Sequence, residues 1–194
     1  ERELNDASFL KAEAAADIVE GALHYKAAGD KYAEKEDYKN AAENFLKALS
    51  LYNGFEEEDK IRMAVYISWD NRLKEASQIL SGIVAQNPSN TMARVHLARI
   101  LSWDGGFDDA ISQAEAVLKV NPEDRDALLI KANSLNWKGD AEAAVPIYRG
   151  LLETGEDFDV RLGYAGALLS TGDVADAEKE FLLLRPGLPY QERE

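Results

Sequence analysis

Three evenly spaced tryptophans are the residues best suited to bind a ligand. Trp69, Trp103 and Trp137 lie 34 residues apart, each directly after a serine or an asparagine. Indole rings at equal intervals could stack on sugar rings or hold an extended chain. They could also fill the gap between one structural unit and the next, and packing is the commoner role of aromatic residues that recur at one helical position.

No other group of residues has the types and spacing of a catalytic or metal site. His24 and His96 are far apart and form no ligand pattern such as HExxH. Acidic residues gather around Asp108 and Asp157, but at the start of a helix they are explained by capping and by the helix dipole. The sequence has no cysteine, no glycine-rich phosphate loop and no nucleophile elbow. We therefore expect no enzyme activity, no cofactor and no metal.

The tryptophans belong to units of 33 to 35 residues that recur along the chain. When each unit is numbered from its first residue, position 20 is always alanine: Ala41, Ala76, Ala110, Ala144 and Ala177. Position 8 is always small: Gly29, Ala64, Ala98, Ala132 and Ala165. Small residues are needed where helix backbones approach closely, and spacings of three, four and seven residues are helical. Each unit is therefore predicted to be a pair of helices.

Turn residues mark the ends of the predicted helices. Glycines such as Gly139 end the first helix of a unit, while Asp108 and Asp140 are placed to accept backbone hydrogen bonds at the start of the second. Asn87-Pro88 closes one unit and opens the next, because proline ends a helix before it and suits the first turn after it.

These units resemble the tetratricopeptide repeat, whose pattern has large residues at positions 4, 7, 11, 17 and 24 and small ones at 8, 20 and 27. The first unit matches it through Tyr25, Gly29, Tyr32, Tyr38, Ala41, Phe45 and Ala48. The resemblance implies an all-α fold, a right-handed superhelical solenoid of five helix pairs. The pairs are expected near residues 22–55, 57–90, 91–124, 125–157 and 158–191, within a single domain of residues 1–194.

The two ends of the chain carry apolar residues outside the five units. Residues 6–21 are predicted to form a leading amphipathic helix capped by Asn5-Asp6. It could run without a break into the first unit, because only Gly21 interrupts it. At the other end, Phe181-Leu-Leu-Leu184 has no following helix to cover it, although solenoids normally end in a polar cap. We expect the parent chain to continue past Glu194, or this end to meet a partner or a second copy.

The resemblance also implies a ligand surface. In tetratricopeptide proteins the first helices line the concave face, and positions 2, 5, 9, 12 and 13 point inward. Carried over to this chain, the groove residues are Ile61, Val65, Ser68, Trp69, Val95, Arg99, Ser102, Trp103, Leu129, Asn133, Asn136 and Trp137. The fifth unit offers Leu162, Gly166, Leu169 and Ser170. This mixture of apolar and hydrogen-bonding side chains suits an extended peptide or an oligosaccharide.

The charge of the chain narrows the class of partner. Its formal net charge is −14, with 36 acidic and 22 basic residues, so nucleic acid and anionic lipid surfaces are poor partners. No apolar run approaches the roughly 18 residues that cross a bilayer, so no membrane insertion is expected. The predicted function is a non-enzymatic scaffold that binds a neutral or basic protein or peptide segment along its concave face. Self-association through the uncovered ends is a further possibility.

A second resemblance leaves an alternative open. Trp-x-Gly before the turn, as at Trp103 and Trp137, is similar to periplasmic tetratricopeptide repeats of bacterial exopolysaccharide-export proteins. It implies that the tryptophans could guide a polysaccharide in the bacterial envelope, and it favours the periplasm over the cytoplasm. The absence of cysteine fits an oxidising compartment.

Overall fold

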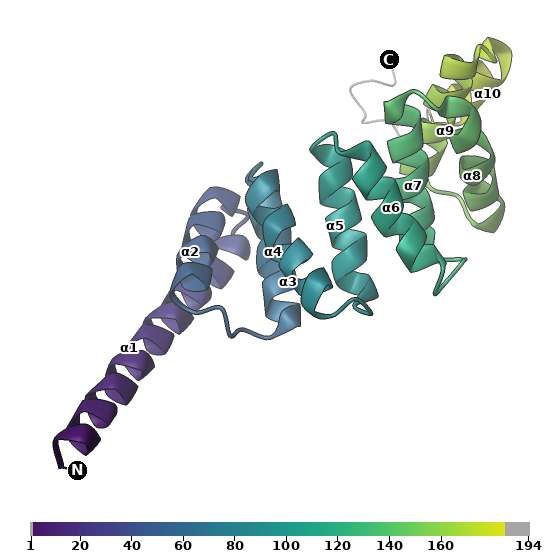
Figure 1. Ribbon diagram of the computed structural model, residues 1–194. Coiled ribbons are helices and arrows are strands. Elements are labelled where there is room, and N and C mark those ends of the chain that lie inside the picture. The colour runs from purple at the N-terminus through teal and green to yellow at the C-terminus, as the bar shows by residue number, and fades with distance from the viewer. Residues whose placement is uncertain (1, 185–194) are drawn as a thin grey trace. The chain divides into compact units, whose positions relative to one another are not determined.

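The described part of the chain is built from α-helices joined by short connections. In the computed structural model, which describes the backbone of residues 2–184 and the side chains of residues 14–184, it forms ten helices and no strand. The helices are α1 (Arg2–Ala33), α2 (Tyr38–Leu51), α3 (Glu57–Trp69), α4 (Leu73–Gln86), α5 (Thr91–Trp103), α6 (Phe107–Leu118), α7 (Arg125–Lys138), α8 (Ala141–Thr154), α9 (Phe158–Thr171) and α10 (Val174–Leu184) (Figure 1). The predicted all-α fold class is confirmed.

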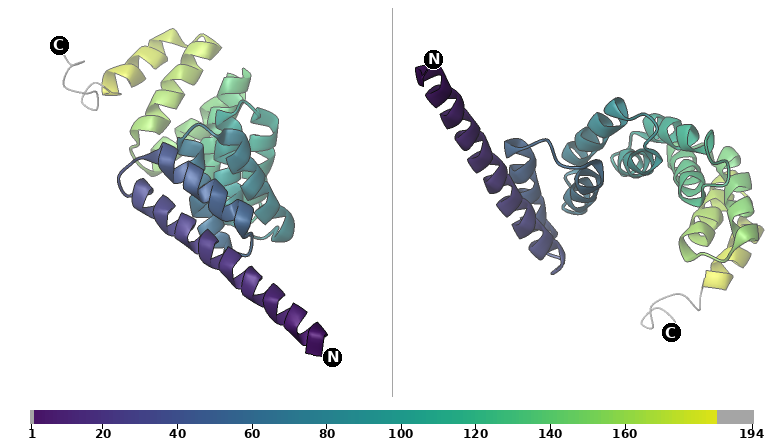
Figure 2. Two further views of the ribbon diagram at one scale, coloured as in Figure 1. Left: turned by 90° about the vertical axis from the view of Figure 1, so that its left-hand side faces the viewer. Right: turned by 90° about the horizontal axis from the view of Figure 1, so that it is seen from below.

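The helices form five consecutive pairs, from α1–α2 to α9–α10, as the repeat predicts. They divide into two compact units, Glu1–Asn87 with α1–α4 and Pro88–Glu194 with α5–α10. Within each unit every helix packs on the next one in sequence. In the second unit α7 also contacts α5 and α9, so the first helices of successive pairs lie side by side (Figure 2). That the whole chain is a single domain stays a prediction.

The recurring small residues lie where helices meet. All five alanines at position 20 are fully buried, and so are the four alanines at position 8. In the first unit position 8 is Gly29, where a Cβ atom would lie only 2.5 Å from the Phe45 ring. A side chain there would clash with a large core residue, which explains the glycine. The small residues that recur in the sequence therefore mark contacts between helices, as predicted.

The turns inside the pairs use left-handed backbone at their centre. Gly139 and Gly172 have φ values of 99° and 89° and end α7 and α9. Asp140 then accepts a hydrogen bond from the backbone N–H of Ala143 at the start of α8, as predicted. The prediction that Asp108 caps α6 is wrong. The N-cap is Gly106, which is equivalent to Asp140, so Asp108 falls inside the first turn.

The N-terminal helix differs from the prediction in its length. The leading helix and the first helix of the first pair are one unbroken helix, α1, which passes through Gly21 and begins ahead of Asn5-Asp6, so these residues do not cap it. A Cβ atom at Gly21 would meet only the Leu51 side chain, at 3.9 Å. This glycine therefore does not mark a turn. The side chains of residues 1–13, and residues 185–191 of the fifth predicted pair, lie outside the described residues.

Candidate ligand-binding cleft

The first helices of the second unit, α5, α7 and α9, line a cleft of about 660 Å³. Seven of the predicted groove residues line it: Arg99, Ser102, Trp103, Leu129, Asn133, Asn136 and Trp137. Leu162 and Gly166 of α9 line it too. Helical positions 5, 9, 12 and 13 therefore face the same space from neighbouring helices, because the pairs repeat. That these residues bind a ligand stays a prediction.

The other predicted groove residues lie elsewhere. Val95 packs against the apolar core around Ala98 and Val117 rather than lining the cleft. Ile61, Val65, Ser68 and Trp69 belong to α3 in the first unit.

Within the first unit, two of these side chains are core residues. Ile61 and Ser68 are 3% and 6% exposed, and the Ser68 hydroxyl donates to the Val65 carbonyl at 2.6 Å. Ile61 and Ser68 therefore contribute to the packing of α3 within the first unit.

Six residues that line the cleft were not predicted from the sequence: Asp126, Ile130, Tyr148, Asp157, Asp159 and Gly163. Asp126 and Asp159 occupy position 2 of their units, one of the positions that the repeat pattern turns inward, so the pattern held the signal that could have found them. Tyr148 belongs to a second helix, α8, and reaches the cleft because its ring passes between α7 and α9. The repeat pattern gives no sign of that.

Tyr148 connects the core with the floor of the cleft. Its side chain is fully buried, and its hydroxyl donates to Asn133 Oδ1 at 2.6 Å. Burial raises the pKa of Tyr148, and a hydrogen bond from Asn136 to the hydroxyl acts in the opposite direction. The neutral phenol therefore holds Asn133 in place. The ring fits because residue 163 is glycine, since a Cβ atom there would lie 2.7 Å from Tyr148 Cε1.

Carboxylates outnumber cations around the cleft. Asp126, Asp157 and Asp159 line it, against Arg99 alone. Arg99 Nη2 pairs with Asp126 Oδ1 at 2.9 Å. Asp157 accepts from the N–H of Val160 at the start of α9, and its Oδ2 lies 3.7 Å from Arg125 Nη2. Asp159 is exposed in the first turn of α9, and no described cation pairs with it. The cleft therefore presents a surplus of negative charge.

The tryptophans are partly packed and partly exposed. Trp69, Trp103 and Trp137 are 48%, 48% and 52% exposed. In the second unit the Trp137 ring lies 6.4 Å from the ring of Phe107, which starts α6. In the first unit the Trp69 ring lies edge-on to Tyr38, at 5.0 Å. Each of these two indoles thus packs against the preceding helix pair and leaves about half of its surface open.

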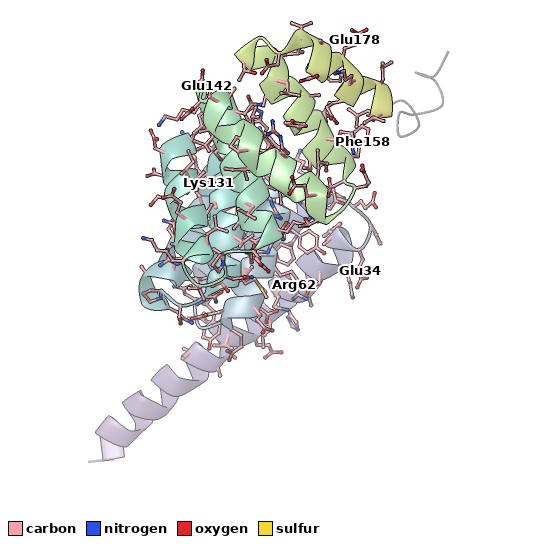
Figure 3. All side chains as sticks on the ribbon, turned by 90° about the vertical axis from the view of Figure 1, so that its right-hand side faces the viewer. Glu34, Arg62, Lys131, Glu142, Phe158 and Glu178 are labelled. Atoms are coloured by element: carbon pink, nitrogen blue, oxygen red, sulfur yellow. The ribbon has the colours of Figure 1, made fainter. Side chains whose placement is uncertain are left out.

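An apolar surface also lies on the last helix pair. Val174 and Leu182 are 60% and 55% exposed, and Leu169 lies beside them. Glu178, at the opposite end of this pair from Phe158, borders the same surface (Figure 3). Nothing within the described residues covers these side chains, so self-association through this end stays a prediction.

The described residues contain no group of three or more histidine, cysteine, aspartate or glutamate side chains arranged to hold a metal ion. Within the same part of the chain, no helix combines the length and apolar character needed to span a bilayer.

The repeat is also recognised from the amino-acid sequence without reference to the structure. A family model for the tetratricopeptide repeat matches residues 104–157 and 138–192. Residues 104–192 therefore match the tetratricopeptide repeat by sequence, and the predicted resemblance to this family is confirmed. Repeat proteins of this kind build extended binding surfaces from stacked helix pairs, and the family is typically a protein-interaction scaffold without catalysis.

Solved structures share the tetratricopeptide-repeat fold over most of this chain. MamA (residues 41 to the end) from Desulfovibrio magneticus has a TM-score of 0.71 at 13% identity, covering 84% of this chain and 93% of that one. A further MamA structure has a TM-score of 0.67 at 18% identity, covering 84% and 88%. A tetratricopeptide-repeat protein from Parabacteroides merdae has a TM-score of 0.69 at 17% identity, covering 88% of this chain and 68% of that one. At these identities the likeness concerns the fold.

No curated protein sequence matches this tetratricopeptide-repeat chain. The family match and the structural neighbours give no support to the resemblance to exopolysaccharide-export proteins or to a periplasmic location.

Proposed function

We propose that this chain is a non-enzymatic scaffold that binds an extended segment of a partner protein in the cleft of α5, α7 and α9. The observation that carries the proposal is the arrangement of Asn133, Asn136 and Tyr148. The buried Tyr148 hydroxyl fixes the amide group of Asn133 before any ligand arrives, and Asn136 lines the cleft beside it. Donors and acceptors that are already oriented lose less conformational entropy when they bind.

Asn133 is suited to recognise a peptide main chain. Its Oδ1 accepts from Tyr148, and within the described residues its Nδ2 group donates to no acceptor. The amide hydrogens therefore remain for a carbonyl oxygen of a ligand, and an asparagine amide matches a peptide group in hydrogen-bonding capacity. Leu129 and Leu162 flank this position and offer apolar contact to the side chains of the bound segment.

The charge around the cleft favours a neutral or basic segment. Three aspartates and one arginine line it, and the arginine is already paired with Asp126. Asp157 also lies 3.7 Å from Arg125, which leaves Asp159 without an ion-pair partner among the described residues. An acidic segment would be repelled by Asp159, whereas a basic one would be attracted. The overall charge of −14 acts in the same direction at longer range.

The test fills the cleft without disturbing the core. A Cβ atom at Gly166 would make only an ordinary contact, 3.9 Å from Asn136 Nδ2, so Gly166→Leu should place its side chain in the cleft. Gly150→Leu is the matched control, because a Cβ atom at this helical glycine of α8 meets nothing within 4 Å and Gly150 does not line this cleft.

Peptides selected from a random twelve-residue display library against the full chain are then measured on both variants. We expect their affinity to fall by at least about tenfold, or 1.4 kcal/mol, in Gly166→Leu and to stay unchanged in Gly150→Leu. A library that yields no binder, or binders that ignore the filled cleft, would overturn the proposal.

A polysaccharide is the second candidate ligand, and the half-exposed faces of Trp103 and Trp137 favour it, since sugar rings stack on indoles. Tryptophan emission separates the candidates. Oligosaccharides that quench or shift the emission of the wild-type chain but not of Gly166→Leu would support this ligand. Unchanged emission across a panel of neutral and acidic oligosaccharides would remove it.

A further inference from the structure

The cleft has two walls of different chemistry at opposite ends of the same helices. On α7, Asp126 is at the second residue and Trp137 at the thirteenth. Eleven residues of α-helix rise by about 16 Å, so the acidic end and the indole end of α7 are separated by that distance along its axis. Leu129, Asn133 and Asn136 occupy the floor between them.

The neighbouring helices extend both walls. Asp159 of α9 lines the cleft from the first turn of its helix, as Asp126 does from α7. Trp103, the last residue of α5, lines it from the other end, as Trp137 does from α7. The repeat therefore generates an acidic wall along the helix N-termini and an indole wall along the C-termini, because equivalent positions of successive first helices face the same cleft.

The side chains of both walls are accessible to a ligand. The Asp126 side chain is 66% exposed despite its pair with Arg99, and Asp159 has no ion-pair partner among the described residues. Trp103 and Trp137 keep about half of their surface open. A cationic side chain could pair with a carboxylate on one side, while an apolar or aromatic one covers an indole on the other.

An extended chain points successive side chains in opposite directions. Lying across α5, α7 and α9, with its main chain over Asn133 and Asn136, it would direct one set of alternate side chains to the aspartates and the other set to the tryptophans. The two ends of α7 are about 16 Å apart along its axis. A comparable width is spanned by a lysine or arginine side chain on one side of the bound segment together with a large apolar side chain on the other.

We propose that the cleft selects an extended partner segment in which basic and apolar residues alternate, with the basic side chains at Asp126 and Asp159 and the apolar ones at Trp103 and Trp137. This inference rests on the proposed function and adds the sequence character of the ligand. Charge complementarity supports it, since the acidic wall lies on one side of the cleft and not on the other.

The test compares peptides of equal composition. A labelled octapeptide of alternating lysine and valine is titrated against the full chain by fluorescence anisotropy, beside an octapeptide of four lysines followed by four valines. Both carry the same charge and apolar surface, so only the order of residues differs. We expect the alternating peptide to bind about tenfold more tightly, and its binding to be lost in Gly166→Leu.

Two aspartate variants test the acidic wall. Asp159→Asn should weaken the alternating peptide by about fivefold, the effect of one exposed ion pair. Asp109→Asn is the control, because Asp109 is also exposed in the first turn of a helix, α6, but does not line the cleft. Trp137→Ala should weaken the alternating peptide as well and leave its salt dependence in place.

The outcomes separate the two proposals. Equal affinity of the alternating and block peptides, or equal effects of Asp159→Asn and Asp109→Asn, would overturn the alternation while library peptides sensitive to Gly166→Leu still supported the scaffold. If no peptide of either kind is sensitive to Gly166→Leu, both proposals fail.

Discussion

The hydroxyl oxygens of Ser102 and Ser134 lie 2.8 Å apart, and both side chains are buried where α5 meets α7. The Ser134 hydroxyl also donates to the carbonyl of Ile130 at 2.7 Å. Because a hydroxyl has one hydrogen, Ser102 must be the donor in the pair between the two serines. The Ser102 hydroxyl therefore depends on Ser134, while Ser134 keeps a partner without Ser102.

This asymmetry predicts unequal effects of two equivalent substitutions. Ser134→Ala should lower the free energy of unfolding by about 1–3 kcal/mol, because it leaves the buried Ser102 hydroxyl without its acceptor. Ser102→Ala should cost less, and the double variant should be no less stable than Ser134→Ala alone. Urea unfolding of the three variants measures the differences. Equal losses for the two single variants would show that the donor assignment is wrong.

Two helical glycines of the second unit should respond to alanine in opposite directions. Gly163→Ala places a Cβ atom 2.7 Å from the Tyr148 ring and should destabilise by about 1–3 kcal/mol, as overpacking does. Gly150→Ala meets nothing within 4 Å and should stabilise by about 0.5–1 kcal/mol, because alanine favours the helix. Thermal unfolding monitored by circular dichroism gives both signs. A stabilising Gly163→Ala would contradict the packing of Tyr148 against α9.

His96 should make stability depend on pH. Burial lowers its pKa from the ordinary 6.5, and the nearby charge of Arg99 lowers it further, although Asp126 acts in the opposite direction. The unfolded chain therefore binds this proton at a higher pH than the folded chain. The contribution of neutral His96 is complete above about pH 6.5 and is lost as the pH falls through the folded pKa.

Replacing this histidine should reduce the loss of stability at acidic pH. The free energy of unfolding in urea, measured at pH 7.5 and pH 5.5, should differ less in His96→Gln than in the wild type. His24→Gln, an equal change at an exposed position of α1, is the control. An unchanged pH difference in His96→Gln would place the acid sensitivity in other groups.

Arg125 should hold the connection between α8 and α9. Its Nη1 donates to the Leu151 carbonyl and to Thr154 Oγ1, both at 2.8 Å, and its Nη2 lies 3.7 Å from Asp157 Oδ2. A lysine has one nitrogen in place of this fork. Arg125→Lys should therefore speed hydrogen exchange in residues 152–158 by several-fold, while the amides of α5 serve as an internal reference. Equal exchange in the two proteins would show that the loop is held by other contacts.

The sequence was sufficient to predict the fold because the same helix packing recurs in each unit. Alanines at position 20 recur wherever two helices of a pair approach, so their spacing identified the pairs without any structure. Gly21 left open whether the leading helix and the first pair are continuous, and the structure has one unbroken helix there. A single glycine costs a helix about 1 kcal/mol at most, and the flanking helical residues of α1 outweigh that.

The cleft was predictable only in part. Residues such as Asn133 and Trp137 follow from position in the repeat, because position decides which face of the first helix they occupy. Tyr148 could not be found in that way, as it reaches the cleft from a second helix through the space left by Gly163. Ile61 shows the converse, since it is 3% exposed in the first unit while the equivalent Leu129 lines the cleft.

The contacts of Tyr148 would couple ligand binding in the cleft to folding. A segment bound at Asn133 would also strengthen the position of a ring that fills the core between α7, α8 and α9. Any cleft ligand should accordingly raise the melting temperature of the protein in proportion to the logarithm of its concentration. A thermal-shift screen of unrelated peptides could thus find the natural partner, and attempts to redesign the specificity of the cleft will have to leave this tyrosine in place.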